Sequence, residues 1–205
     1  MKHEIKPQES ARAKAFELWM SSPMPMVTLT KTFDVTNIIK TSRHKGVKFN
    51  SLMCWCIAKA ASHVEHFYTL PEQGKLYAYT NLAVNVIVKT QSGGINSCDI
   101  PFDDNFAQFI HDYDKLTTQV SEECKSIFMA DRMIIGTSAM VETEIDSIVN
   151  QYTDKFCNPM VMWGKYRKQW FRTTLPISFQ FHHVQMDGGD AAHFLELLQR
   201  EIYTI

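Results

Sequence analysis

The chain has 205 residues, of which 45% are apolar and 21% are charged, the usual mixture of a globular protein. Its 21 Lys and Arg residues nearly balance its 22 Asp and Glu residues, and a net charge of −1 provides no basic surface for nucleic acid. The longest apolar runs fall far short of the roughly 20 residues that span a bilayer. We therefore expect a protein that binds neither nucleic acid nor membrane. We also expect a single domain over residues 1–205.

The first part of the chain contains helical and extended patterns in turn. Apolar residues recur at helical spacing in Ser10–Met20, and the first residue of that segment is a suitable N-cap, so we predict a helix there. Side chains alternate in Met26–Phe33 as they do in a strand. A second helix is expected from about Thr36. Leu52–Val64 is apolar on nearly every side, which predicts a buried, central helix.

The remainder of the chain contains five segments with the β-branched or alternating pattern of strands. They are Leu76–Thr80, Asn81–Thr90, Arg132–Val141, Pro159–Trp163 and Ile177–Val184. Apolar residues recur at helical spacing in Phe106–Val120 and Ala191–Ile202. Because helices and strands are interleaved, the sequence predicts an α/β (α+β two-layer) fold, in which a mixed β-sheet is packed with helices on one side.

The segment Phe181–Phe194, FHHVQMDGGDAAHF, carries the clearest chemical signal. A strand ends in two histidines, and adjacent strand residues point to opposite faces, so only one of the two can reach a given pocket. The glycine pair at 188 and 189 allows the chain to turn sharply beside the second histidine. An imidazole titrates near neutrality and can take a proton from an alcohol or thiol and return it.

Three interpretations of this segment stay open on spacing alone. The first is a catalytic histidine, and the second is a buried structural histidine with Asp187 capping the last helix. The third is a metal site formed by His182, His183, Asp187 and His193, although the spacing lacks the one-face geometry of a helical histidine pair. The five cysteines are odd in number and lack CxxC spacing, which indicates free thiols in a reducing cytoplasm rather than zinc ligands.

The sequence HHVQMDG resembles the HHxxxDG signature of CoA-dependent acyltransferases, and most of the chain resembles the chloramphenicol acetyltransferase family. Trp163–His183, WGKYRKQWFRTTLPISFQFHH, is similar to the GKY…LPL…QVHH stretch of that family. Asp103–Tyr113, DDNFAQFIHDY, is similar to its DDFxQFxxxY helix, and Ala11–Trp19 to its N-terminal R-x-x-x-F helix. The resemblance implies a chloramphenicol acetyltransferase-like fold and a homotrimer.

The resemblance also implies the roles of individual residues. His183, the second histidine of the pair, is implied as the general base that takes a proton from a substrate hydroxyl. Asp187 is implied to pair with Arg12 of the first helix and so to fix the turn that aims His183. Lys165 and Tyr166 match a pair near the CoA nucleotide, where an ammonium suits a phosphate and a phenol can lie against adenine.

The acceptor pocket is where this chain departs from the family pattern. The resemblance implies that Val27, Met129 and Met162 help to line it. Met129 stands where the family has a serine whose hydroxyl donates to the oxyanion, and Met162 replaces a threonine. Losing one oxyanion donor typically costs about 10²–10³ in rate. Ser126, Ser138 or a backbone N–H are the candidates to substitute for it.

We therefore expect a cytoplasmic, acetyl-CoA-dependent O-acetyltransferase that acts on chloramphenicol or a related hydroxylated compound. The resemblance implies direct transfer without an acyl-enzyme, acetyl-CoA as a co-substrate, no tightly bound cofactor, no metal, and a role in antibiotic resistance. The alternative is a catalytically weak or inactive trimer that binds a small molecule on the same scaffold.

Overall fold

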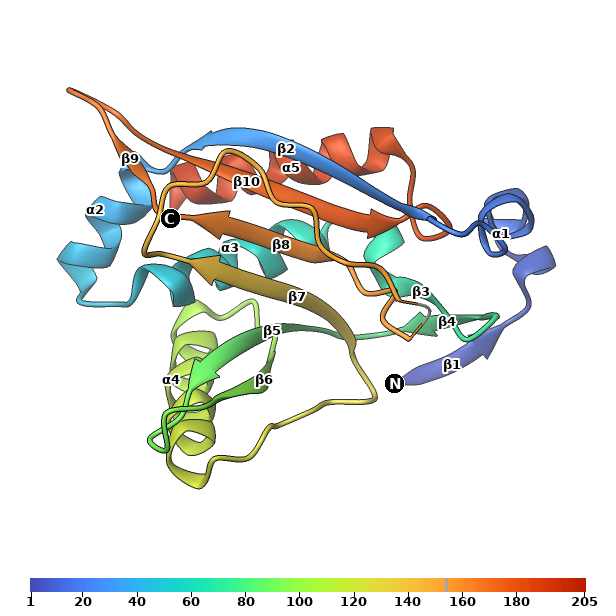
Figure 1. Ribbon diagram of the computed structural model, residues 1–205, viewed down its shortest axis with the longest axis horizontal. Helices are drawn as coiled ribbons and strands as arrows, with labels where there is room; N and C mark the ends of the chain where they lie inside the picture. Colours follow the sequence, from blue (N-terminus) through green and yellow to red (C-terminus); the bar gives the residue numbers. More distant parts are fainter. Residues whose placement is uncertain (154) are drawn as a thin grey trace.

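The computed structural model describes residues 1–153 and 155–205 and has the layered architecture that the sequence predicts (Figure 1). Among the described residues, seven strands form a large sheet in the order β2-β10-β8-β7-β5-β6, with β9 paired to β10. These strands are β2 (Met26–Asp34), β5 (Leu82–Lys89), β6 (Ile95–Pro101), β7 (Met133–Met140), β8 (Met160–Gly164), β9 (Arg167–Lys168) and β10 (Thr173–His182). The pairs β5–β7 and β7–β8 are parallel and the others are antiparallel, so the sheet is mixed, as predicted.

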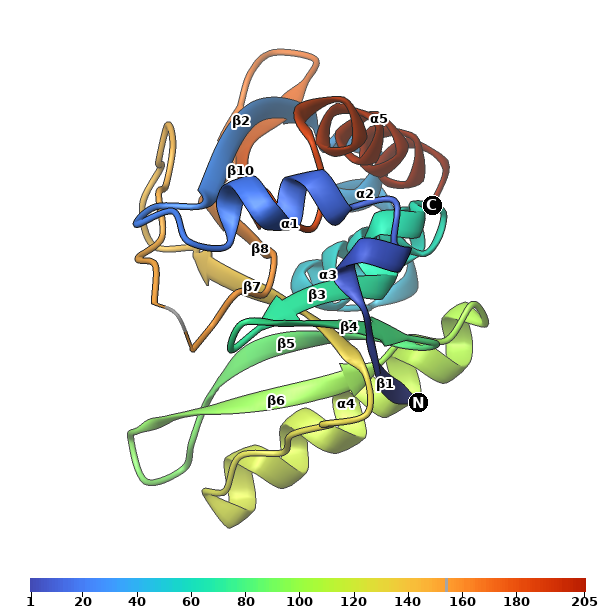
Figure 2. The same ribbon diagram turned by 90° about the vertical axis from the view of Figure 1, so that its right-hand side faces the viewer.

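Helices cover one face of this sheet, and an irregular segment crosses the other (Figures 1 and 2). The covering helices are α2 (Thr36–Lys45), α3 (Phe49–Ser62), α4 (Phe106–Glu123) and α5 (Gly188–Thr204). Nine residues of α3 are buried, which confirms that it is the central helix. Residues 141–159 contain no helix or named strand among those that are described, and they lie over the helix-free face of the sheet.

The helix α1 (Ala13–Trp19) lies at the end of the sheet where β10 finishes, next to a short 3-10 turn, η1 (Pro7–Glu9) (Figure 2). A helix from Ser10 was expected, and this start is wrong by three residues. The Ser10 hydroxyl donates back to the Pro7 carbonyl and accepts from the Arg12 N–H, so Ser10 closes the 3-10 turn instead of beginning the helix.

Two further boundaries differ from prediction at the histidine segment. Strand β10 ends at His182 and not at Val184, because the Gln185 N–H bonds back to the His182 carbonyl at 2.8 Å and turns the chain. Helix α5 begins at Gly188 and not at Ala191, because Asp187 and Asp190 form a capping box at its start. His183 therefore lies in a turn, outside regular β geometry.

A small second sheet was not predicted. It contains β1 (Lys2–Ile5), β3 (Thr69–Glu72) and β4 (Lys75–Tyr79), in the order β1-β4-β3, and a 3-10 turn, η2 (Glu65–Tyr68), leads into β3. The prediction also missed β6 of the large sheet, whose residues INSCDIP carry few β-branched side chains. Of the strands in the small sheet, β4 matches the predicted segment Leu76–Thr80, whereas β1 and β3 have only four residues each and were missed.

The core between the sheet and the helices contains a cluster of four phenylalanines. Phe179 of β10 is fully buried and lies 4.6 Å from Phe194 of α5, 5.3 Å from Phe181 and 5.9 Å from Phe67, measured between ring centroids. The cluster links β10 to α5, the two elements on either side of the turn that contains His183 (the histidine turn). The position of that turn therefore depends on how these rings pack.

We expect Phe179→Ala to lower the free energy of unfolding by about 3–5 kcal/mol, because it removes a buried ring and leaves a cavity. The matched control is Phe171→Ala, whose side chain is 94% exposed and whose loss should change stability by less than about 0.5 kcal/mol. Urea denaturation of both variants measures the difference. Similar values for the two would show that the cluster is not the core that we describe.

Candidate active site

The His183 side chain lies at the end of the large sheet, against helix α1. Its ring stacks on the Trp19 indole, with centroids 4.6 Å apart and planes within 5° of each other. The backbone N–H of His183 donates to the Pro25 carbonyl at 2.8 Å. About a quarter of the side chain, 28%, is exposed. The imidazole is therefore fixed in orientation and still open to an incoming molecule.

The two ring nitrogens of His183 have different surroundings. Nδ1 is shielded from solvent and lies 3.2 Å from Asp187 Oδ1, without the alignment that a hydrogen bond needs. This leaves Nε2 as the nitrogen through which the ring can exchange a proton with a bound molecule. No pattern in the sequence predicts Trp19 as a partner of this ring.

Arg12 holds the histidine turn through four hydrogen bonds. Its two terminal nitrogens donate to the Asp187 carboxylate at 2.7 and 2.9 Å. It also donates to the backbone carbonyls of His183 and Val184, both at 2.8 Å. The Arg12 guanidinium holds the pKa of Asp187 below its usual range, and burial of the carboxylate opposes this only in part. The structure thus brings together the three residues that the resemblance implied.

His182 has a different environment from His183. It is fully buried, and its Nδ1 accepts a hydrogen bond from the Val184 N–H at 3.1 Å. Burial, with His183 beside it, lowers the pKa of His182 to about 4. His182 is therefore neutral at physiological pH, and its buried ring supports the backbone of the turn. His193 is exposed on α5, so the possible metal ligands His182 and His193 do not share a site.

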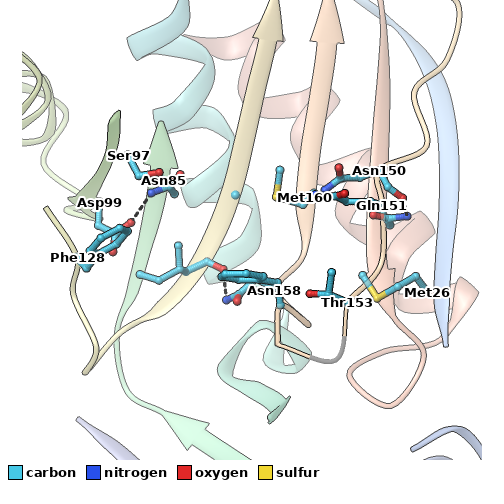
Figure 3. A pocket seen from close by; sticks show the side chains of 14 residues that line it. Met26, Asn85, Ser97, Asp99, Phe128, Asn150, Gln151, Thr153, Asn158 and Met160 are labelled. Carbon is cyan, nitrogen blue, oxygen red and sulfur yellow. Dashed lines mark hydrogen bonds between the residues drawn. The ribbon is translucent and has the colours of Figure 1, made fainter. Parts of the chain in front are cut away.

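A cavity of about 300 Å³ lies on the helix-free face of the sheet, beneath residues 141–159 (Figure 3). Five of its residues form one row across five neighbouring strands. In register, Asp99 of β6 faces Asn85, Asn85 faces Gly136, Gly136 faces Met160, and Met160 faces Gln180 of β10. A Cβ atom on Gly136 would meet the Met160 sulfur at 2.0 Å, so glycine leaves the space that this thioether occupies.

The three residues that we expected in an acceptor pocket do not line this cavity directly. Val27 pairs with Phe181 and packs against the hydrophobic core, whereas its neighbour Met26 lines the cavity. Met162 is buried and lies two residues beyond Met160 in the same strand. The backbone N–H of Met129 donates to the Asp99 carboxylate at 2.8 Å, which ties the Met129 loop to the end of the row.

The two serines considered as oxyanion donors have different environments. The Ser126 hydroxyl accepts from the Ser97 N–H and donates to Asn96, so its donor is already used. Ser138 is partly exposed and lies two residues after Gly136, on the same face of β7 as the cavity. Among the described residues no group takes the Ser138 hydroxyl proton, so of the two serines Ser138 is the one that can donate.

Lys165 and Tyr166 lie away from the histidine turn, in a second hollow of about 520 Å³ that follows strand β8. The Tyr166 ring lies 5.8 Å from the Phe49 ring, and the Lys165 ammonium is exposed. Lys48, at the start of α3, also lines this hollow and forms an ion pair with Asp114 at 3.1 Å. The hollow therefore combines two ammonium groups with an aromatic wall.

The fold is that of the CoA-dependent acyltransferases. A solved chloramphenicol acetyltransferase matches it with a TM-score of 0.85, at 17% identity, covering 98% of this chain and 100% of the other. The truncated catalytic core of the 2-oxoacid dehydrogenase multienzyme complex from Thermoplasma acidophilum matches with a TM-score of 0.69, at 15% identity, covering 98% and 99%. These likenesses confirm the predicted fold class.

The chloramphenicol acetyltransferase family model matches residues 3–199, so the chain belongs to that family of acyltransferases. It is similar to chloramphenicol acetyltransferase 3 of Escherichia coli, with 25% identity over 197 residues that cover 92% of this chain and 91% of the relative. It is also similar to the chloramphenicol acetyltransferase of Bacillus pumilus, with 24% identity over 92% of this chain and 88% of the relative. The family expected from the sequence is thereby confirmed.

Within the described residues, no helix has the length and apolar character needed to cross a bilayer. Across the same residues, no three His, Cys, Asp or Glu side chains are arranged to hold a metal ion.

We expect the buried His182 to make stability depend on pH. Its pKa is about 4 in the folded chain and 6.5 when unperturbed, so between these values the unfolded chain binds more protons. The free energy of unfolding therefore falls as pH drops from 6.5 towards 4, by at most about 1.4 kcal/mol per pH unit, and the effect is absent above 6.5. Urea denaturation across this range should show a shallower slope for His182→Gln, and equal slopes would contradict a neutral, buried His182.

Proposed function

We propose that the protein is an acetyl-CoA-dependent O-acetyltransferase acting on a small hydroxylated acceptor, chloramphenicol or a related compound. The observation that carries the proposal is the His183 imidazole, stacked on Trp19 and held through Arg12 and Asp187, with Nε2 as its accessible nitrogen. Such a ring can act as a general base without further rearrangement.

In the proposed reaction, His183 Nε2 takes the proton of the acceptor hydroxyl while the hydroxyl oxygen attacks the thioester carbonyl of acetyl-CoA. A C–O bond forms, and the carbonyl oxygen becomes an oxyanion that Ser138 or a backbone N–H stabilises. The C–S bond then breaks, and the CoA thiolate receives the proton from His183. Both substrates are bound together, so no acyl-enzyme forms, and holding them together supplies much of the rate enhancement.

We further propose a homotrimer in which His183 of one subunit faces the cavity of the next. Two observations support this arrangement. His183 does not line the cavity of its own chain. Phe128 and Phe156, which do line it, are 71% and 72% exposed, and Val149 of the overlying segment is 74% exposed. Apolar side chains so exposed around a cavity are typical of a surface that another subunit covers.

We place acetyl-CoA with its nucleotide over the hollow formed by Lys165, Tyr166 and Lys48. Ammonium groups suit phosphates, and the Tyr166 ring offers a face to adenine. Acetyl-CoA is a co-substrate in this scheme and is released after each turnover as CoA.

We expect His183→Ala to lower the rate of free-thiol release from acetyl-CoA by about 10²–10⁴-fold, because it removes the general base. The KM for acetyl-CoA should stay within a factor of about two, since the proposed nucleotide site lies elsewhere. The matched control is His193→Ala on the exposed face of α5, which should leave the rate unchanged. A His183→Ala enzyme with normal turnover would rule out the proposed base.

We expect Lys165→Ala to raise the KM for acetyl-CoA about 5-fold without changing kcat, the size of effect that an exposed ammonium–phosphate contact gives. Lys168→Ala, which removes an equally exposed ammonium three residues away, is the matched control and should leave KM unchanged. Steady-state kinetics at varied acetyl-CoA decides between them. An equal change in both variants would indicate general charge and not a phosphate site.

The replacement of the family's serine by Met129 favours a second candidate, a trimer that binds a small molecule but transfers no acetyl group. Under it, ligand binding is measurable by calorimetry while no thiol is released with any acceptor, and His183→Ala leaves binding intact. The thiol-release assay therefore separates the two candidates.

A further inference from the structure

Asp99 places a negative charge at one end of the cavity row. Only 2% of Asp99 is exposed. Its two carboxylate oxygens accept from the Asn85 amide at 2.7 Å and from the Met129 N–H at 2.8 Å. Among the residues that the structure describes, no Lys, Arg or His nitrogen lies within ion-pair distance of this carboxylate. A buried charge held only by neutral donors is costly unless a cation reaches it.

The other end of the row presents acceptors with no partner among the described residues. Gln180 is 2% exposed, and its amide N–H₂ donates to the Asn150 carbonyl at 3.1 Å. Within the part of the chain that the structure describes, Gln180 Oε1 is buried without a hydrogen-bond partner, and so is the Thr153 hydroxyl, which also lies on the cavity wall. Unmet polar atoms that line a cavity are sites where a ligand recovers the lost hydrogen bonds.

The cavity also has an apolar part. Met26, Ile134, Met160, Phe128 and Phe156 contribute to its walls. Figure 3 shows Asp99, Asn85 and Ser97 on one side and Asn150, Gln151, Met160 and Thr153 on the other. A volume of about 300 Å³ suits a single small molecule of drug-like or metabolite size.

We propose that this cavity binds a hydroxylated amine whose ammonium group pairs with Asp99. The ligand's hydroxyl groups donate to Gln180 Oε1 and exchange hydrogen bonds with Thr153, while its carbon skeleton or ring lies over Met160 and Gly136. As the identity of the acetyl acceptor, this inference rests on the proposed function, and it selects a free amine over a neutral N-acylated compound such as chloramphenicol. The chemical class of the ligand is supported independently by the contacts of Asp99 and Gln180.

The test uses two molecules of the same shape. 2-Amino-1-phenylpropane-1,3-diol carries an ammonium group at pH 7, and 1-phenylpropane-1,2,3-triol has a hydroxyl in its place. Calorimetric titration of the wild-type protein without acetyl-CoA measures binding alone, with no transfer step. We expect the amine to bind at least about 10-fold more tightly than the triol, since only the amine supplies a charge-assisted partner for Asp99.

Two variants locate the effect. Asp99→Asn removes the charge and keeps an oxygen for the Asn85 amide, and it should bring the affinities of the two molecules within about 2-fold of each other. Asp112→Asn removes the same charge from helix α4, away from the cavity, and should preserve the preference. A folded Asp99→Asn protein that still prefers the amine would overturn the assignment to Asp99. Wild-type protein that binds the triol as tightly, or that binds neither molecule, would overturn the proposal without any variant.

A parallel assay separates this inference from the proposed function. Thiol release from acetyl-CoA is followed with the amine, the triol and chloramphenicol as acceptors. A preference for the amine in binding, with no thiol release from any acceptor, would overturn acetyl transfer and leave the ligand class standing. Rapid transfer to chloramphenicol with no preference for the amine would support the proposed function and overturn the inference.

Discussion

The hydrogen bonds of Arg12 are the constraint on which the site depends. One guanidinium binds two backbone carbonyls of the histidine turn and the carboxylate that starts helix α5. The chain leaves β10 at His182 and enters α5 at Gly188, so this cation joins the strand, the turn and the helix at one point. A planar fork with fixed donor directions is suited to such a junction, and a lysine ammonium could not replace it. The orientation of the His183 ring follows from that junction and from its stacking on Trp19.

The two faces of the large sheet have different roles, because successive side chains of a strand point to opposite faces. On β10, Phe179 and Phe181 point to the helices and form the core, whereas Gln180 points to the cavity. The same alternation on β2 sends Val27 to the core and Met26 to the cavity. The apolar packing that stabilises the fold therefore lies on one face of the sheet, and polar residues lie together on the other.

The family could be predicted from contiguous motifs, and the resemblance then implied that Arg12 and Asp187 pair across 175 positions of the chain. The long helices α3 and α4 have strong apolar patterns. The cavity row could not be predicted, since Asp99, Asn85 and Gln180 are separated in sequence and meet only through strand pairing. Asn85 interrupts an otherwise apolar run in β5, which was an available signal, whereas Asp99 and Gln180 lie in strands that contain other polar residues and gave no such signal.

By itself, the sequence determined the fold class and the family, because periodicity and short motifs encode these locally. Only the tertiary structure decided which ring nitrogen is accessible, which methionine faces the cavity and which carboxylate lies buried without a cation. These properties depend on strand register, where a shift of one residue exchanges the two faces of a sheet. The register of each strand is set by packing over the whole chain, so it cannot be inferred from any short segment.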